Sequence, residues 1–408
     1  METQVIIVGA GITGIRVAQV LQSAGIDYRL LDAETVPGGR VKTNFTNGYT
    51  LDHGFQIINT AYPEFDNCGI NLQELNLKPY ASGAKLFFNG KPNTLADPFR
   101  EKNALFSSLF SPHAGIKDLW LTYKLRRRLS NTALQSLFDQ NTQSTADFLK
   151  DFGFSQTFIQ RFFQPFYSGI FLERELQTPA AMFAFVFSMF DRGYAALPQG
   201  GMCALPAMMC SKLPAEKVLL GHKVLQIETG AVVTDSHLRI NAPFILLATG
   251  TSVMNETGRS NWNGNHSASV LYYGIDTDLG LGRYIGLNAG GDGKVNLISI
   301  PSNVQASYAP EGKKLLSVSL WPGLTATEQN AHAMLKEVEK MVGQSINGEF
   351  LGCFNIPAAL PKLDMLQYEP QIGHPAEGIW CGGDFSAYPS LNAALRAGTL
   401  LAERVLQS

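Results

Sequence analysis

The sequence predicts an α/β protein in two lobes, and three observations support this prediction. The chain has 408 residues, more than a single hydrophobic core usually supports. It opens with an apolar run, a glycine-rich turn and a helical pattern over residues 5–23, which are typical of a buried parallel strand that leads into a helix. A second glycine-rich segment with a helical pattern, residues 378–398, lies near the far end of the chain. We expect the two ends to meet in one lobe and the middle of the chain to form most of the other.

The N-terminal turn carries the glycine pattern of a dinucleotide site. Gly9, Gly11 and Gly14 follow the first apolar run in the spacing GxGxxG. Gly9 permits a tight turn, Gly11 lets a pyrophosphate approach the backbone, and Gly14 lets helix and strand pack closely. The free N–H groups at the start of the helix, at Ile12 and Thr13, then face the phosphates.

An acidic residue follows at the spacing that this type of site requires. A second predicted strand, Tyr28–Leu31, is followed by Asp32 and Ala33, and Asp32 lies 23 positions after Gly9. This is near the roughly 20-residue offset at which a carboxylate meets a ribose hydroxyl. Glycines and acid together favour a dinucleotide site over an ordinary glycine-rich turn.

The next segment indicates which dinucleotide binds. Pro37–Arg40 resembles the GGR element of the flavin amine oxidase and phytoene desaturase superfamily. In that superfamily the two glycines pass close to FAD and the arginine approaches its phosphates. The resemblance implies these roles for Gly38, Gly39 and Arg40, and with them a GxGxxG flavoprotein that has a Rossmann-like FAD-binding lobe and an α+β substrate lobe with a mixed sheet and helices.

The C-terminal segment resembles the second FAD element of the same superfamily. There a strand ends in Gly-Asp, here Gly383-Asp384, and the carboxylate binds the ribityl–phosphate region. The helix that follows points its N-terminus at the flavin ring, where its N–H groups stabilise the anion formed on reduction. The resemblance implies flavin contacts from the start of this helix, at Ser390, Leu391, Asn392 and Ala394.

A third stretch resembles the D-x-G turn beside the flavin in family members. Here it is Asp52-His53-Gly54, followed by Phe55 and Gln56. Gly54, Phe55 and Gln56 are expected at the flavin, since a glycine permits close backbone approach. For His53 two interpretations stand, a turn residue that caps a backbone carbonyl or a residue of the substrate cavity, and Gln56 is a second candidate catalytic residue.

The remaining expected cofactor contacts come from the middle of the chain. Residues 198–202 resemble the P-x-G-G-M turn after which family members return to the nucleotide lobe. Val224 lies where the family passes its backbone along the adenine, and Ala248-Thr249-Gly250 matches the A-T-G ending of a late strand. The expected lobes are therefore discontinuous: residues 1–60, 191–260 and 361–408 bind FAD, and residues 61–190 and 261–360 bind substrate.

Candidate catalytic side chains follow from the resemblance to amine oxidases, which often place aromatic residues and a lysine near the flavin. Tyr388 falls where one aromatic wall is common, although an aromatic residue before a helix can also serve as a hydrophobic staple. Trp321 or Tyr272 is the candidate second wall, and Lys294 is the candidate lysine. The Tyr-Met-Glu found at the helix start of amine oxidases is replaced here by residues 390–392, which counts against an ordinary monoamine oxidase.

Composition narrows the expected partners. The net charge of −2 gives no electrostatic reason to expect a nucleic acid. The five cysteines form no CxxC pair, so we expect no disulfide framework, no metal site and a reducing, cytoplasmic location. Cys381 lies within a predicted strand, which favours non-covalent FAD. No apolar window reaches the roughly 18 residues of a membrane span. The basic run Arg126–Arg128 is compatible with weak contact to anionic lipid or with a solvated helix end.

These observations lead to one principal hypothesis and two alternatives. The principal one is an FAD-dependent oxidoreductase that removes a hydride from an apolar or weakly polar small molecule by C–C or C–N desaturation, with oxygen as a candidate acceptor. The alternatives are an amine oxidase that releases aldehyde and ammonia, and a non-catalytic flavin-binding redox protein. NAD(P) alone conflicts with the C-terminal Gly-Asp segment. Substrate identity and oligomeric state do not follow from the sequence.

Overall fold

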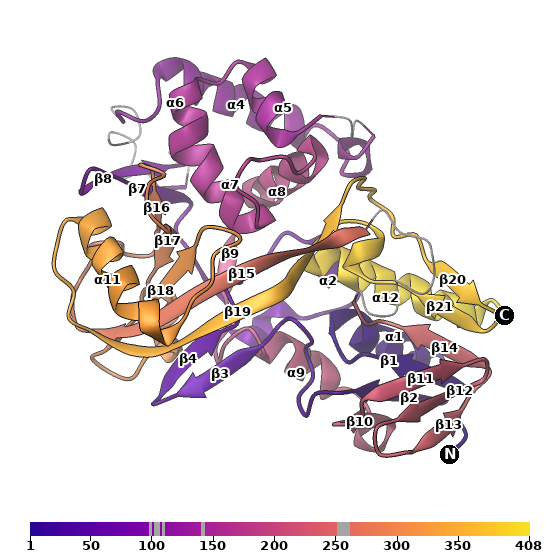
Figure 1. Ribbon diagram of the computed structural model, residues 1–408. Coiled ribbons are helices and arrows are strands. Elements are labelled where there is room, and N and C mark those ends of the chain that lie inside the picture. Colours follow the sequence, from indigo (N-terminus) through magenta and orange to yellow (C-terminus); the bar gives the residue numbers. More distant parts are fainter. Residues whose placement is uncertain (98–99, 102–106, 108–110, 140–142, 251–261) are drawn as a thin grey trace.

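The chain folds into two lobes of mixed α/β structure (Figure 1). The computed structural model describes residues 1–97, 100–101, 107, 111–139, 143–250 and 262–408. The expected boundary at residues 260/261 lies outside these ranges. The two-lobe α/β prediction is confirmed. None of the described helices combines the length and the apolar character that crossing a membrane requires.

The dinucleotide lobe is built on a six-stranded sheet. In spatial order its strands are β10 (Val218–Leu220), β2 (Tyr28–Asp32), β1 (Val5–Val8), β14 (Phe244–Leu247), β21 (Ile379–Cys381) and β20 (Gly373–Ala376). Neighbours pair in parallel, except that β20 is antiparallel to β21. The central strand β1 is buried at all four positions, as a purely apolar strand between two covered faces should be. The two ends of the chain thus share one sheet, as the sequence predicts.

Both faces of this sheet are covered. Helices α1 (Ile12–Ser23) and α12 (Leu391–Leu406) lie side by side on one face, and α9 (Ala204–Cys210) packs beside α1. The two long helices approach so closely that a Cβ on Gly398 would lie 2.6 Å from the carbonyl oxygen of Thr13. An antiparallel sheet of β11 (Val224–Glu228), β12 (Ala231–Thr234) and β13 (Arg239–Asn241) packs its apolar residues on the other face.

The second lobe is built on a seven-stranded mixed sheet. Its strands, in spatial order, are β19 (Gly348–Leu363), β15 (Trp262–Ile275), β18 (Lys314–Leu320), β17 (Val295–Ser299), β16 (Ile285–Asn288), β7 (Gly83–Phe88) and β8 (Lys91–Ala96). Helix α11 (Glu328–Val342) packs on one face. The short helix α10 (Pro301–Val304) follows β17.

The two longest strands leave the body of this sheet as a ribbon. Figure 1 shows β15 and β19 running from the second lobe to the dinucleotide lobe. The sequence predicts only 270–275 and 350–354 as strands here, and treats the proline-rich 356–361 as a connecting segment. That prediction was wrong, because Pro357 and Pro361 lie within β19, which is an edge strand. An edge strand tolerates proline, since the missing N–H can face solvent instead of a neighbouring strand.

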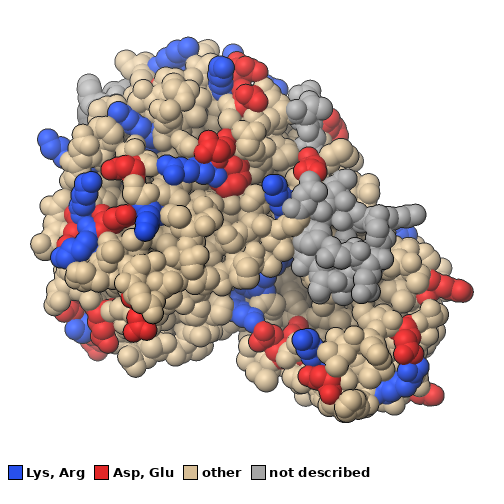
Figure 2. Space-filling model, in the orientation of Figure 1, with Lys and Arg blue, Asp and Glu red and all other residues tan. Residues whose placement is uncertain are grey.

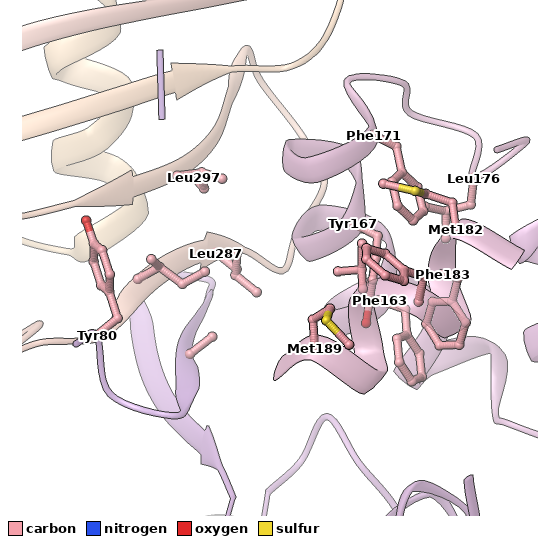
Figure 3. Packing of buried hydrophobic residues seen from close by; sticks show 14 of the residues in the cluster. Tyr80, Phe163, Tyr167, Phe171, Leu176, Met182, Phe183, Met189, Leu287 and Leu297 are labelled. Atoms are coloured by element: carbon pink, nitrogen blue, oxygen red, sulfur yellow. The ribbon is translucent and has the colours of Figure 1, made fainter. Parts of the chain in front are cut away.

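Helices cover the other face of the second sheet. These are α4 (Ile116–Ser130), α5 (Thr145–Phe152), α6 (Gln156–Phe158), α7 (Gln164–Phe171) and the buried α8 (Ala180–Arg192). Figure 3 shows side chains of α7 and α8, among them Phe163 just before α7, Tyr167 and Phe183, in one cluster with Leu287 and Leu297 of the sheet. The aromatic stretch 158–172 therefore belongs mainly to the core.

Short elements join the two lobes. One is a hairpin of β3 (Thr43–Thr46) and β4 (Tyr49–Asp52). Another is the small sheet of β5 (Ile58–Asn59), β9 (Ala195–Leu197) and β6 (Lys78–Pro79). Helix α2 (Pro63–Asn67) follows β5 in the chain. Phe65 and Leu75 pack into the core of the dinucleotide lobe, together with Val5. Residues 61–75 therefore belong with that lobe, although the sequence assigned them to the other one.

Candidate active site

The glycine loop after β1 has the geometry that its sequence predicts. Gly9 has φ +103°, a backbone conformation that favours glycine. A Cβ on Gly14 would lie 1.8 Å from the carbonyl oxygen of Gly9, so this position packs helix against strand. A Cβ on Gly11, in contrast, would meet nothing closer than the Cα of Gly39 at 3.9 Å. The protein's own packing requires glycine at Gly9 and Gly14 but not at Gly11.

Asp32 lies at the end of β2, directly beside this loop. Its Oδ2 accepts a hydrogen bond of 2.6 Å from the N–H of Ala10, and its Oδ1 accepts one of 2.9 Å from the N–H of Glu34. The carboxylate is thus fixed in orientation and still has lone pairs for hydroxyl donors. The next residue, Ala33, is exposed and can offer only its backbone.

The two distant FAD elements meet through an ion pair. Gly38 sits against the glycine loop, where its N–H donates to the carbonyl of Ala10 at 2.8 Å. Two positions on, the Nη2 of Arg40 lies 2.6 Å from the Oδ1 of Asp384, whose side chain is only 6% exposed. The Nη1 of Arg40 donates to the carbonyl of Ala359 in β19 at 2.9 Å. The structure therefore brings together two residues that the sequence placed separately near the phosphate and ribityl regions.

The start of α12 is fixed by its own side chains and by α1. Ser390 caps the helix by accepting from the N–H of Ala393 at 2.9 Å, and Thr13 donates to the carbonyl of Ala394 at 3.0 Å. Asn392 is buried, and its amide accepts from the N–H of Glu64 and donates to the hydroxyl of Tyr388. The side chain of Asn392 thus holds α2 and Tyr388 in place. With its side chain engaged in this way, Asn392 has its backbone left for the flavin contact expected at the start of this helix.

The described residues fit a dinucleotide with a pyrophosphate. No side chain caps the N-terminus of α1, and the open direction at Gly11 faces Gly39 of the GGR element. The Oγ1 of Thr249, which lies against Gly9, is buried without a hydrogen-bond partner in the described part of the chain. Ala248 continues β14 toward the same loop through its N–H bond to Val8. Of the other expected cofactor contacts, Gly250 is exposed and Val224 is half-buried.

Asp52 of the D-x-G turn joins three parts of the chain. Its Oδ1 accepts from Thr43 at 2.6 Å and from the N–H of Met202, in the predicted P-x-G-G-M turn, at 2.9 Å. Its Oδ2 accepts from the hydroxyl of Tyr308 at 2.7 Å. Burial raises the pKa of Asp52 to about 6, although all three hydrogen bonds favour the ionised form. The buried carboxylate therefore accepts hydrogen bonds from within the protein and holds the D-x-G turn in place.

Aromatic side chains surround Gly54, which has φ +97°. The hydroxyl of Tyr272, from β15, donates to the carbonyl of Asp52 at 2.7 Å. Phe354 of β19 stacks on the His53 ring at a centroid distance of 4.1 Å and meets Tyr272 nearly edge-on. We refer to these rings, together with Phe55 and Tyr80, which contact each other, as the aromatic frame.

His53 and Gln56 serve the turn itself. The Nε2 of His53 lies 3.0 Å from the Oδ1 of Asn44, and burial lowers the pKa of its imidazole. Gln56 donates to the carbonyls of Arg40 and His53. The partner of the His53 ring is thus a side-chain amide and not the backbone carbonyl of the first interpretation, and the stacked ring forms one side of the aromatic frame.

Two other candidate residues, Tyr388 and Lys294, lie away from the aromatic frame. Tyr388 is buried among Phe138, Phe185 and Tyr368, so it packs the junction of the lobes and is no wall beside Trp321. Lys294 is exposed on the turn before β17, and its N–H bonds to Glu337 of α11. Because α11 covers the outer face of the sheet, the structure does not bring Lys294 to the aromatic frame.

Three polar side chains near α7 carry buried atoms that have no hydrogen-bond partner in the described part of the chain. The sequence predicts a hydrogen-bonding role for none of them. Asn296 is 1% exposed, and neither its Oδ1 nor its Nδ2 has a partner among the described residues. The Oγ of Ser319, a half-buried residue of the neighbouring strand β18, and the Nε1 of Trp321, directly after that strand, also lack a partner among the described residues. Asn296 occupies a bulge in β17, where the register with β18 shifts, and faces Gly169 of α7. A bulge often re-aims a side chain beside a functional site, and no sequence signal marks one here.

Comparison with known proteins agrees with this fold. A stretch of 59 residues is 41% identical to a protein named "Possible lysine-specific histone demethylase 1" from Drosophila melanogaster, and it covers 14% of this chain and 7% of that protein. An oxidoreductase from Methanosarcina mazei superposes with a TM-score of 0.70 at 16% identity, covering 99% of this chain and all of the other. A putrescine oxidase bound to putrescine superposes with a TM-score of 0.69 at 15% identity over the full length of both chains. At such identities these structures are similar in fold alone.

The family itself is decided by a wider match. The model of the family described as flavin containing amine oxidoreductase matches residues 12–406. This range includes the whole of α1, the GGR element, the aromatic frame and the whole of α12. The chain belongs to the flavin-containing amine oxidoreductase family and is an FAD-dependent oxidoreductase.

Proposed function

We propose that this enzyme oxidises an apolar or weakly polar organic molecule bound at the aromatic frame, by desaturation of a C–C or C–N bond. The observation that carries this proposal is the set of rings around Gly54, drawn from β15, β19 and the D-x-G turn. Such rings bury a large apolar area and have well-defined orientations. They suit a flat or unsaturated molecule better than a strongly charged one.

In this proposal the dinucleotide lobe binds and orients the cofactor. Gly11 and the uncapped start of α1 hold the pyrophosphate, Asp32 the ribose hydroxyls, and Asp384, fixed by Arg40, the ribityl–phosphate region. The bound flavin supplies the hydride acceptor. Tyr272 holds the carbonyls of the D-x-G turn and thereby fixes Gly54 at the cofactor's face.

We propose that the flavin is bound without a covalent link. Cys381, the cysteine of the C-terminal FAD element, is the buried last residue of β21 in the six-stranded sheet and packs with Ile6 and Val8. Burial raises the pKa of its thiol, which lowers its reactivity as a nucleophile. Cys203 directly follows the P-x-G-G-M turn, and its thiol donates to the carbonyl oxygen of Gly200 at 3.6 Å.

The polar atoms near α7 suggest how a weakly polar group would be accepted. Asn296, Ser319 and Trp321 together offer hydrogen-bond donors and an acceptor that are otherwise unpaired in the described structure. A buried polar group without a hydrogen-bond partner lowers the stability of the protein, and a partner on a bound molecule would remove that cost. A substrate that carries one carbonyl, hydroxyl or amine could supply that partner while its apolar part fills the aromatic frame.

Amine oxidation proper is the second candidate, favoured by the name of the family. It differs in its product, because C–N oxidation followed by hydrolysis releases ammonia and an aldehyde. The position of Lys294 on the outer face weakens the analogy with amine oxidases, which often keep a lysine near the flavin.

The test begins with the purified protein's visible spectrum. A flavin spectrum whose chromophore stays in solution after denaturation and removal of the protein supports non-covalent FAD; a chromophore that remains with the protein contradicts it. Anaerobic bleaching is then followed with a panel of polyamines, monoamines and apolar molecules that carry C–C or C–N single bonds open to desaturation. Bleaching by an apolar molecule, with an alkene or imine as product, supports the proposal. Bleaching by amines alone, with ammonia released, supports the second candidate, and no bleaching by any of them favours a non-catalytic flavoprotein.

A further inference from the structure

Helix α4 presents apolar and basic side chains together on its exposed face. The described residues include ten exposed large hydrophobic side chains, and three of them lie on this one helix: Ile116 (76% exposed), Trp120 (58%) and Tyr123 (46%). Their spacing places them on a single stripe, since residues three and four apart are neighbours on a helix surface. The opposite side of α4, at Leu121 and Leu125, is buried in the core. No other helix of the described structure carries such a stripe.

The charges on this face all have one sign. Lys117, Lys124, Arg127 and Arg128 are exposed, and within the described structure none of them forms an ion pair with a carboxylate. The only acidic residue of the helix, Asp118, is 2% exposed and accepts hydrogen bonds from Gly115 and Ser155. The face is therefore cationic as well as apolar, which most solvated helix faces are not.

Arg126 differs from its two neighbours in the basic run. Its guanidinium pairs with Asp97 at 3.0 Å and with Asp191, so its charge is balanced inside the protein. The sequence grouped Arg126–Arg128 as one basic cluster, but only Arg127 and Arg128 are free to act outward. Both Arg126 and Arg127 line, with Tyr123, Ser130 and Asn131, an open hollow of about 430 Å³ at the end of the same helix.

We propose that α4 docks this enzyme on an anionic membrane surface. The helix would lie along the interface with Ile116, Trp120 and Tyr123 inserted at the level of the headgroups, where aromatic rings with a polar edge are favoured. Lys117, Lys124, Arg127 and Arg128 attract acidic lipid headgroups. The ammonium of Lys124 lies 5.4 Å from the centroid of the Trp120 ring and 5.9 Å from that of Phe152, so cation and aromatic rings already stand together on this face.

The observations favour lipid over a protein partner for a chemical reason. A protein partner selects scattered complementary groups, whereas a fluid anionic surface needs only a stripe of apolar residues flanked by cations. The helix lies on the outside of the second lobe, away from the dinucleotide lobe (Figure 1). Figure 2 shows the same orientation in space-filling form, where lysine and arginine side chains lie along this upper edge with acidic side chains beside some of them. Docking there leaves the dinucleotide lobe and its glycine loop facing water.

The experiment measures binding of the purified holoenzyme to vesicles by cosedimentation. One set of vesicles is phosphatidylcholine alone and the other contains phosphatidylserine as well. We expect binding to the acidic vesicles only, weakened by added salt. We also expect a blue shift of tryptophan emission that is absent from Trp120→Phe, since Trp120 is the exposed tryptophan of the helix.

Matched variants separate this helix from general surface properties. Arg127→Gln with Arg128→Gln, and separately Trp120→Ser, are expected to lower the vesicle partition about tenfold or more. Lys336→Gln with Lys340→Gln removes the same charge from α11, and Phe45→Ser removes an exposed ring that is 65% exposed on β3; both should bind as the parent does. All four variants change exposed side chains and should retain FAD and the fold.

Three results would overturn the proposal. The first is absence of binding to either kind of vesicle at low salt. The second is binding that survives both α4 variants, which would place the lipid contact elsewhere. The third is a dimer in sedimentation equilibrium that Trp120→Ser abolishes, which would show that a second copy of the chain covers this face.

Discussion

Arg40 and Asp384 form an ion pair of 2.6 Å across 344 positions of sequence. Each belongs to one of the two FAD elements, so the pair links the N-terminal and C-terminal segments of the dinucleotide lobe. Arg40 is 42% exposed, and an ion pair with one solvated partner contributes little to stability. Its main effect is to fix the orientation of the buried Asp384 carboxylate.

Asp384→Ala should therefore weaken FAD binding far more than it weakens the fold. We expect the Kd for FAD to rise about tenfold or more, equivalent to about 1.4 kcal/mol, with little change in the Tm of the apoprotein. Quenching of flavin fluorescence on titration of the apoprotein measures the Kd. Glu228→Ala, which breaks the surface pair with Arg239, is the matched control and should change neither quantity. Unchanged affinity in Asp384→Ala would mean that the C-terminal motif has been misread.

Two glycines of the same loop should respond in opposite ways. Gly11→Val should fold, because its Cβ meets nothing closer than 3.9 Å, but should lose FAD, because the side chain enters the space assigned to the pyrophosphate. Gly14→Ala should unfold or lose several kcal/mol, because its Cβ would lie 1.8 Å from a backbone oxygen. Thermal melts and FAD content of both variants test this. Stoichiometric FAD in a folded Gly11→Val protein would contradict the assignment.

Asp52 should make the stability of the protein depend on pH. Its pKa is raised from 3.8 to about 6 by burial, so the folded chain keeps a proton between these pH values that the unfolded chain releases. The stabilisation is complete below the unfolded pKa and is lost as the pH rises through about 6, a change of about 3 kcal/mol. Urea unfolding of the apoprotein from about pH 4 to about pH 7, compared with Asp52→Asn, measures it.

The difference in unfolding free energy between parent and Asp52→Asn should fall over that range. Asp278→Asn is the matched control: the N–H of Gly280 lowers the pKa of Asp278 below 3.8, so its stabilisation is complete above that pH and the difference from the parent should stay nearly constant over this range. A difference for Asp52→Asn that stays constant with pH would mean that the buried carboxylate is ionised throughout.

The parts of this site that could be predicted from the sequence are the local ones. Gly9, Gly14 and Asp32 lie within one strand–helix–strand unit, where spacing alone determines which backbone groups meet. The resemblance located Arg40 and Asp384 separately, but their pairing depends on how β21 and the GGR element approach in three dimensions. Tyr388 shows the same limit, because its position before α12 was correct while the rings that surround it come from α8 and from residues 138 and 368.

The second lobe was harder to predict because its contacts are long-range. Tyr308 donates to Asp52 from 256 positions away, and no motif marks it. Lys294 was chosen by residue type, but the fold places it on the outer face with α11. Asn296 could not be found at all, since the bulge that turns it toward α7 arises from the pairing of β17 with β18.

Asn296 offers a direct test of whether its orphaned amide serves function or structure. A buried amide without partners costs about 1–3 kcal/mol, so Asn296→Leu, which is similar in shape, should raise the Tm of the protein. If the amide receives a polar group of the substrate, the same variant should lose catalytic efficiency about tenfold or more. Ser188→Ala removes another buried, unpartnered polar atom, from α8, and should leave the kinetics unchanged. A stabilised Asn296→Leu enzyme with unaltered kinetics would remove Asn296 from the substrate site, whereas gain of stability with loss of activity is the pattern of a group retained for binding.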